Sequence, residues 1–292
     1  MSEFVFIDSL KKVKKEDWNS CVGSDHPFIQ YEFLFALEKS GSACSQTGWK
    51  PHHYIEYNDN AEIIAICPLY LKSHSYGEYI FDHAWADAYH RHGLNYYPKL
   101  QSAIPFTPVT GERIFINKKI SKRKDKIKDI INNIIREAKK LNVSSAHFNF
   151  IKNPNEWDGE EPIMIREGIQ FHWENNDYKS FDDFLSTLSS RKRKQIKKER
   201  QCLEINNLEV KLLSGEDLKK QDFDFFYECY LDTTGRKWGS TYLKKEFFMD
   251  ILKNFKDKIL LMVAYQNNTK VASALNFISK THLYGCLWGS KF

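Results

Sequence analysis

Apolar residues recur along the chain at two spacings, one typical of helices and one of strands. Between residues 124 and 141 isoleucines recur at steps of three and four, which places them on one face of a helix. Ser180-Phe181-Asp182-Asp183 resembles a capped helix start, so we predict a helix from there to about Ile205. Further helices are predicted at residues 17–22, 31–40, 222–233 and 242–255.

Runs rich in β-branched and aromatic residues predict strands on either side of these helices. A polar turn at residues 266–269 separates two apolar runs, which predicts a hairpin of residues 259–265 and 270–278. A further strand is expected at residues 282–288. In the first half the predicted strands are residues 53–57, 62–71, 76–81 and 145–151.

One segment of the chain occurs twice. Residues 57–79 align without a gap on residues 265–287, where chance would give about one or two identities. The identical pairs are Tyr57/Tyr265, Asn60/Asn268, Lys72/Lys280, His74/His282, Tyr76/Tyr284 and Gly77/Gly285. Coincidence between two hairpins that share turn chemistry is the alternative. The repeat predicts two related α/β domains, residues 1–175 and 176–292, divided in a polar stretch near residues 175–179.

The two predicted domains are unequal in length. Only residues 286–292 follow Gly285, whereas about a hundred residues follow Gly77 before the boundary. The second domain is therefore expected to be incomplete at its C-terminal end, with its last strand as an exposed edge.

Composition narrows the class of protein. The chain has 292 residues, of which 42% are hydrophobic and 28% charged, which is typical of a globular protein. A net charge of +5 does not by itself indicate nucleic acid or membrane. The six cysteines form no C-x-x-C pair, which argues against a zinc knuckle and fits buried thiols in a reducing compartment. Without a signal peptide or a long apolar run, we expect a cytoplasmic location and no membrane-spanning segment.

Several stretches of the chain are long and rich in rare residues. The longest is SHSYGEYIFDHAWADAYHRHGLNYYPKLQSAIPFTPVTG at residues 73–111. The others are HPFIQYEFLFALEKSGS (26–42), QFHW (170–173), SFDDFLSTLSSRKRKQIKKER (180–200), TGRKWG (234–239) and LYGCLWG (283–289). Together these stretches resemble one bacterial family of predicted N-acyltransferases, described under peptidoglycan biosynthesis or recognition and related to the Fem-type aminoacyl transferases and the GNAT superfamily. The resemblance covers nearly the whole chain. It implies tandem GNAT-like domains with mixed sheets flanked by helices, and transfer of an acyl or aminoacyl group to an amine.

Within residues 73–111, this chemistry points to two carboxylates. Asp82 and Asp87 are the candidate bases, because desolvation among aromatic rings would raise the pKa of a carboxylate. Tyr76 and Lys99 are candidates to orient the substrate or to stabilise an oxyanion. Trp85, Tyr97 and His172 complete the candidate substrate-binding residues of the first domain. The alternative is a structural loop held by ring packing and Asp turns.

The histidines of the same segment raise the question of a metal. His90-x-His92 with Asp87 is a pattern that zinc accepts, and His83 lies nearby. No second cluster completes a tetrahedral site, so we expect no metal.

Positive charge is concentrated at residues 191–200, where Arg191, Arg193 and Lys194 are candidate substrate-binding residues. Such a strip attracts the phosphates of coenzyme A, of a lipid pyrophosphate or of tRNA. Arg236 and Lys237 form a second basic group. The alternative in each case is a solvated helix face.

The acyl donor is left open between acyl-coenzyme A and aminoacyl-tRNA. The chain has no Q/R-x-x-G-x-G/A loop to present backbone amides to a pyrophosphate, which weakens coenzyme A as the donor. No permanently bound cofactor is expected.

Three functions compete at this point. The first is an N-acyltransferase acting on a small-molecule or lipid-linked amine, linked to cell-wall precursor metabolism. The second is a catalytically inactive module that recognises a cell-wall precursor or another anionic ligand. The third, a nucleic-acid-binding protein, is the weakest, because the basic run contains no interleaved stacking aromatics. No DNA partner is expected, and the oligomeric state is left open.

Overall fold

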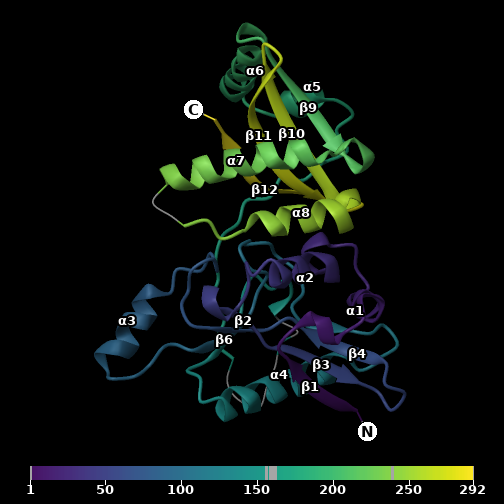
Figure 1. Cartoon of the computed structure of the whole chain (residues 1–292), viewed down its shortest axis with the longest axis vertical. Coiled ribbons are helices and arrows are strands. Elements are labelled where there is room, and N and C mark those ends of the chain that lie inside the picture. The colour runs from purple at the N-terminus through teal and green to yellow at the C-terminus, as the bar shows by residue number, and fades with distance from the viewer. Residues whose placement is uncertain (1, 155–156, 158–162, 238–239, 292) are drawn as a thin grey trace.

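The computed structural model describes residues 2–154, 157, 163–237 and 240–291. Within these residues the fold is mixed α/β, with eight α-helices and three four-stranded sheets. The first half forms two sheets and the second half forms one (Figure 1). Their pairings are antiparallel, apart from one parallel pair in the second sheet.

The sheets have the following strand orders. The first is β1 (Glu3–Ile7), β3 (His53–Tyr57), β4 (Ile63–Cys67) and β7 (Phe115–Ile116). The second is β2 (Trp49–Pro51), β5 (Tyr70–Lys72), β6 (Lys99–Ser102) and β8 (Ala146–Phe148), in which β6 and β8 are parallel. The third is β12 (Leu283–Ser290), β11 (Thr269–Ile278), β10 (Ile259–Gln266) and β9 (Leu208–Ser214).

Most of the predicted helices are confirmed within a few residues. They are α1 (Lys15–Val22), α2 (Tyr31–Lys39), α4 (Arg123–Lys140), α7 (Lys220–Arg236) and α8 (Lys245–Asn254). In α4 the predicted stripe of Ile127, Ile130, Ile131 and Ile134 is buried, which follows from its helical spacing. The sequence did not predict α3 (His83–Arg91), which has no buried residue and projects from the body (Figure 1). Among the described residues, no helix is long and apolar enough to cross a bilayer.

The single helix predicted from Ser180 to Ile205 is instead two helices, α5 (Phe181–Ser186) and α6 (Ser190–Ile205). Each begins at its own serine cap. Ser180 accepts a hydrogen bond from the backbone N–H of Asp183 at 3.1 Å, and Ser189 accepts one from Lys192 at 3.5 Å. A second cap stops the first helix, because an Ncap residue has non-helical backbone angles.

The two copies of the repeat agree in part. Both form an antiparallel hairpin, and both hairpins carry a bulge at the equivalent place, between Glu56 and Tyr57 and between Ala264 and Tyr265. The prediction of a strand at residues 76–81 is wrong, because these residues form turns and loop.

A proline explains why the long strand predicted at residues 62–71 is also wrong. Pro68 has no backbone N–H to continue the ladder, so β4 ends at Cys67 and β5 joins another sheet. In the second half β11 runs on unbroken, and β12 pairs with it in the same sheet. The division into two domains stays a prediction.

The hydrophobic core joins the two halves. The ring of Phe277 on β11 lies 5.0 Å from Phe28 and 5.4 Å from Phe33, measured between centroids. The ring of Phe106 stacks on Tyr242 at 5.2 Å, and the N–H of Lys244 donates to Ser42 Oγ at 3.0 Å. A second, smaller cluster lies beneath α4 within the first half. The halves therefore pack against each other through side chains in their interiors.

Candidate functional site

Four ionisable side chains are buried together beneath the loop that joins β5 to α3. Lys72 on β5 and Lys99 on β6 are directly opposite each other across the sheet, so both side chains leave the same face. Glu78 lies in the loop, and Asp82 precedes the first turn of α3. Each of the four is at most 3% exposed. We call Lys72, Glu78, Asp82 and Lys99 the charged cluster.

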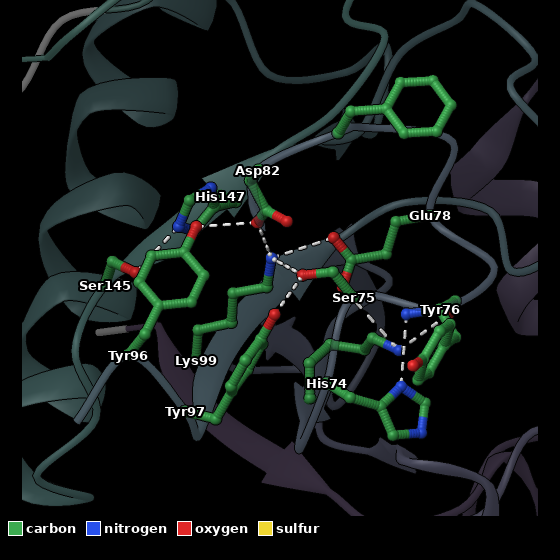
Figure 2. A network of polar contacts seen from close by, with 12 residues as sticks. His74, Ser75, Tyr76, Glu78, Asp82, Tyr96, Tyr97, Lys99, Ser145 and His147 are labelled. Carbon is green, nitrogen blue, oxygen red and sulfur yellow. Dashed lines mark hydrogen bonds and ion pairs between the residues drawn. The ribbon is translucent and has the colours of Figure 1, made fainter. Parts of the chain in front are cut away.

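Lys99 is the centre of the charged cluster (Figure 2). Its Nζ donates to Asp82 Oδ2 at 2.6 Å, to Glu78 Oε2 at 2.9 Å and to Ser75 Oγ at 3.0 Å. An ammonium group has three N–H donors, so these contacts use all of them. Asp82 Oδ2 also accepts from the hydroxyl of Tyr96 at 2.7 Å, whereas Asp82 Oδ1 is buried without a hydrogen-bond partner among the described residues.

Lys72 occupies the other side of the charged cluster. Its Nζ lies 3.7 Å from Glu78 Oε1 and donates to the carbonyl oxygen of Tyr76 at 3.3 Å. The same nitrogen lies 3.7 Å from the centre of a Trp49 ring, a cation–π contact that favours the charged lysine. Trp49 Nε1 donates to the same Tyr76 carbonyl at 3.1 Å, so Lys72 and Trp49 fix the loop backbone together.

The electrostatics of the charged cluster correct one prediction from the sequence. Burial acts to raise the pKa of Asp82, but hydrogen bonds from Lys99 and Tyr96 outweigh it and lower that pKa to about 2. The sequence suggested the opposite direction, because it showed the aromatic neighbours but not the lysine. Asp82 is thus ionised at neutral pH and a weak base.

Burial also shifts the pKa values of Lys72 and Glu78. Burial lowers the pKa of Lys72 to about 7, with Glu78 opposing the shift. Burial also raises the pKa of Glu78, against the attraction of Lys99 and Lys72. Lys72 therefore has a pKa close to neutral pH, and its nearest carboxylate, Glu78, has a pKa above the ordinary value.

A second polar layer surrounds the charged cluster. Tyr97 OH and Ser75 Oγ are hydrogen-bonded at 2.8 Å. Ser145 Oγ lies 2.7 Å from Nε2 of His147, whose ring packs edge-on against Tyr96 at 6.1 Å (Figure 2). The Lys99 partners are thus held in place by side chains from β8 and from the segment before β6.

The structure brings some of the predicted site residues together and leaves others apart. Asp82, Tyr97 and Lys99 lie in or against the charged cluster. Tyr76 contributes its carbonyl, while its side chain is 62% exposed. The side chains of Trp85 and Asp87 are exposed on α3, and the hydrogen-bonded network described above does not include them.

The remaining predicted residues lie outside the charged cluster. His172 is exposed and contacts Gln170 at 3.1 Å. Arg236 pairs with Asp232 and donates to the carbonyl of Ser290 at 3.0 Å. Lys237 lies 5.3 Å from the Trp288 ring, and Trp238 and Gly239 of the same motif lie outside the described residues. Arg191, Arg193 and Lys194 are on α6, which lies at one end of the molecule and far from β6 (Figure 1).

The sequence did not predict Lys72, Glu78 or His147 as members of the site. No local pattern reveals them, because they meet only when β5, β6 and β8 pair. The exposed histidines of α3 and its C-terminal end, His83, His90 and His92, were the visible signal instead. In the described part of the chain, no three His, Cys, Asp or Glu side chains gather as metal ligands.

Two partly buried histidines predict how stability depends on pH. Burial lowers the pKa of His147 and of His26 to about 4, from 6.5. Below pH 6.5 the unfolded chain therefore binds protons that the folded chain does not, so stability is lost as the pH falls. Each histidine should contribute a loss of about 2 kcal/mol between pH 7 and pH 5, measured by urea unfolding.

A variant isolates one of these contributions. Neither ring nitrogen of His26 has a hydrogen-bond partner among the described residues, and its ring packs on Phe28 and Tyr284, so His26→Phe should be accommodated. The variant should lose about 2 kcal/mol less than the wild type over the same pH interval. His92→Gln, at an exposed position, should follow the wild type. An unchanged pH dependence in His26→Phe would contradict the prediction.

A model of the FemAB-like family, described as peptidoglycan biosynthesis/recognition, matches residues 9–292. No curated protein matches the chain. The solved structure of L-PGS from Bacillus licheniformis is similar at 9% sequence identity and a TM-score of 0.44. The match covers 89% of this chain and 65% of the L-PGS chain.

Proposed function

The chain belongs to the FemAB-like family, and on that basis we propose that it is an N-acyltransferase that moves an acyl or aminoacyl group to an amine. The observation that carries the proposal is the charged cluster. Removing charged groups from water costs several kcal/mol for each ion, and a hydrophobic core of similar volume avoids that cost. Groups with shifted pKa values gather at active sites, which favours a functional role for this arrangement.

Asp82 is proposed to hold the acceptor amine. Its Oδ1 atom is buried without a partner among the described residues, which costs about 1–3 kcal/mol unless a donor reaches it. An amine or ammonium N–H supplies such a donor. The low pKa keeps Asp82 negatively charged, which suits a cationic acceptor.

Lys72 and Glu78 are proposed to manage the proton. In the transfer, the amine nitrogen bonds to the acyl carbonyl carbon, and the bond from that carbon to the donor oxygen or sulfur breaks. A cationic acceptor first releases one proton to solvent and becomes a neutral amine. The second proton, lost as the new bond forms, passes to the Lys72–Glu78 pair and returns to the leaving group. A base works best when its pKa is near the working pH, which fits Lys72 at about 7 better than Asp82 at about 2.

The donor is proposed to be an aminoacyl-tRNA, with acyl-coenzyme A as the alternative. The family resemblance and the missing pyrophosphate loop support the first. The acceptor is proposed to be a small or lipid-linked amine of cell-wall precursor metabolism, in line with the family description. Tandem GNAT-like domains, residues 1–175 and 176–292, belong to the same proposal, and the equivalent bulges support them.

One observation favours the second candidate, an inactive module that recognises a cell-wall precursor or another anionic ligand. The charged cluster has equal numbers of lysines and carboxylates, and three of its members are joined by short hydrogen bonds. Such a cluster can also serve to fasten the loop of residues 73–82 to β5 and β6. Turnover separates the two candidates.

We predict that Asp82→Asn lowers the rate of transfer by about a hundredfold, because the amide no longer binds the acceptor as an anion. Transfer should be measured from aminoacyl-tRNA and from acyl-coenzyme A to an amine. Asp129→Asn, an exposed position on α4, is the matched control and should keep wild-type activity. Thermal unfolding should show that Asp82→Asn is folded. Wild-type activity in Asp82→Asn would refute the assignment, and no transfer by the wild type from either donor would favour the inactive module.

A further inference from the structure

Four aromatic side chains form an open pocket where the linker meets the second half of the chain. The pocket has a volume of about 470 Å³ and is lined by Trp173, Tyr178, Phe181 and Phe184, together with Asn175, Lys179 and Ser180. The ring of Phe184 lies 6.0 Å from Trp173 and 5.6 Å from Tyr178 between centroids. We call this the aromatic pocket.

The rings of the aromatic pocket are not buried as a core would be. Trp173 is 64% exposed and Phe181 is 42% exposed. Large aromatic side chains left open to water in one place mark a binding surface more often than a packing element. A pocket of this size holds one flat ring system with a sugar attached.

Basic side chains border the aromatic pocket. Between residues 190 and 200, α6 carries seven Lys or Arg residues and a single acidic one, Glu199. The guanidinium carbon of Arg200 lies 4.2 Å from the centre of the Phe181 ring, and Lys197 pairs with Asp182 at 3.4 Å. These two contacts place the basic face of α6 against α5. Lys179 lines the pocket itself.

The acidic residues near the pocket cancel only part of this charge. Asp182 is paired with Lys197, and Asp183 accepts the backbone N–H of Lys179 at 3.1 Å. Glu174 and Asp177 are exposed on the linker side. The excess of positive charge on α6 therefore remains available to an anion.

We propose that the aromatic pocket and α6 form a binding site for a phosphorylated nucleoside. The base stacks on the rings, and the phosphates lie along the basic residues of α6. Rings alone would suit an apolar ligand and charges alone would suit any polyanion, whereas a stacked base next to a phosphate needs both. In the sequence the aromatic rings come before the basic run of α6. The fold places the rings and the basic run side by side.

The source of the nucleotide rests on the proposed function, in which an acyl donor carries it. Two donors have this chemistry. One is an unpaired nucleotide of an RNA, and the other is the adenosine 3′,5′-bisphosphate end of coenzyme A. In both, the nucleotide is remote from the acyl group. That fits the position of α6, which lies at one end of the molecule and far from the sheet that carries Lys99 (Figure 1).

The test is equilibrium binding by the full chain, without turnover. A fluorescein-labelled single-stranded RNA hexamer is the first probe, and adenosine 3′,5′-bisphosphate is the competitor. Trp173→Leu and Phe181→Leu should each weaken binding about 10- to 100-fold, whereas Trp173→Phe, which keeps a ring, should stay close to the wild type. Trp288→Leu removes an exposed tryptophan elsewhere and is the matched control. Lys194→Ala with Lys198→Ala should lower the salt dependence by about 1.4 in the logarithmic slope.

The outcomes separate cleanly. RNA binding that resists the competitor identifies RNA as the source, and complete displacement identifies the bisphosphate of coenzyme A. Both support the site, provided that the ring variants weaken binding. If neither the RNA hexamer nor the bisphosphate binds, the proposed site is wrong. Binding that Trp173→Leu and Phe181→Leu leave unchanged also overturns the site, because it would show simple attraction of a polyanion. If the chain transfers no acyl group, the binding result still stands. If neither probe binds, the proposed acyl transfer is still tested by turnover.

Discussion

Replacing Lys99 with methionine is expected to lower the free energy of unfolding by about 3–5 kcal/mol. Lys99 is fully buried and donates to both Asp82 and Glu78, so the variant leaves two carboxylates facing each other in the interior without their shared cation. The loss comes from uncompensated charge, since a methionine side chain fills a similar volume. Urea unfolding at pH 7 measures it.

Two further variants give this prediction its controls. Lys253→Met, at an exposed position on α8, should change the free energy by less than about 0.5 kcal/mol. Adding Asp82→Asn to Lys99→Met should recover part of the loss, because it removes one of the unpaired charges. A loss below about 1 kcal/mol in Lys99→Met, or no recovery in the double variant, would show that Lys99 does not hold the charged cluster together.

Phe277→Ala is expected to lower the free energy of unfolding by about 3–5 kcal/mol, through lost burial and the cavity left behind. Phe277 is 1% exposed and contacts Phe28 and Phe33 in the first half of the chain, and Phe255 in the second half. Because one core serves both halves, the wild type should unfold in a single transition in which both halves lose structure together. Calorimetry and urea unfolding followed by two optical probes test this.

The matched control for the second prediction is Phe171→Ala. Phe171 is 96% exposed, so its removal should change stability by less than about 0.5 kcal/mol. Two separate transitions in the wild type would contradict the view that the halves share a core. So would a Phe277→Ala variant in which only the second half becomes less stable.

Local patterns were sufficient to predict some elements of this fold. The isoleucines of α4 repeat at helical spacing, and the asparagine turn before Thr269 marks the β10–β11 hairpin. Both signals lie within one element, so the rest of the fold hardly alters them. The exposed helix α3 went unpredicted, since it has no buried stripe for a periodicity to detect.

The candidate site was only partly predictable for a different reason. Asp82 and Lys99 stood out as polar residues among aromatics, but the charge state of Asp82 depends on Lys99 and Tyr96, which reach it only in the folded chain. Lys72 and Glu78 belong to the charged cluster through the pairing of β5 with β6, which no stretch of sequence displays alone. The basic run of α6 can be read from the sequence. Its contact with the aromatic residues of α5 cannot, because that contact forms only in the folded chain.

The facing lysines of β5 and β6 have a consequence for how this protein can evolve. Lys72 and Lys99 sit opposite each other as like charges, and Glu78 lies within 3.7 Å of both amines. Loss of any one member leaves an unbalanced ion in the interior. A lineage that replaced these residues one at a time would therefore pass through an unstable intermediate. Positions 72, 78, 82 and 99 should therefore change in concert across related lineages, as a set of two cations and two anions or as a set of neutral residues.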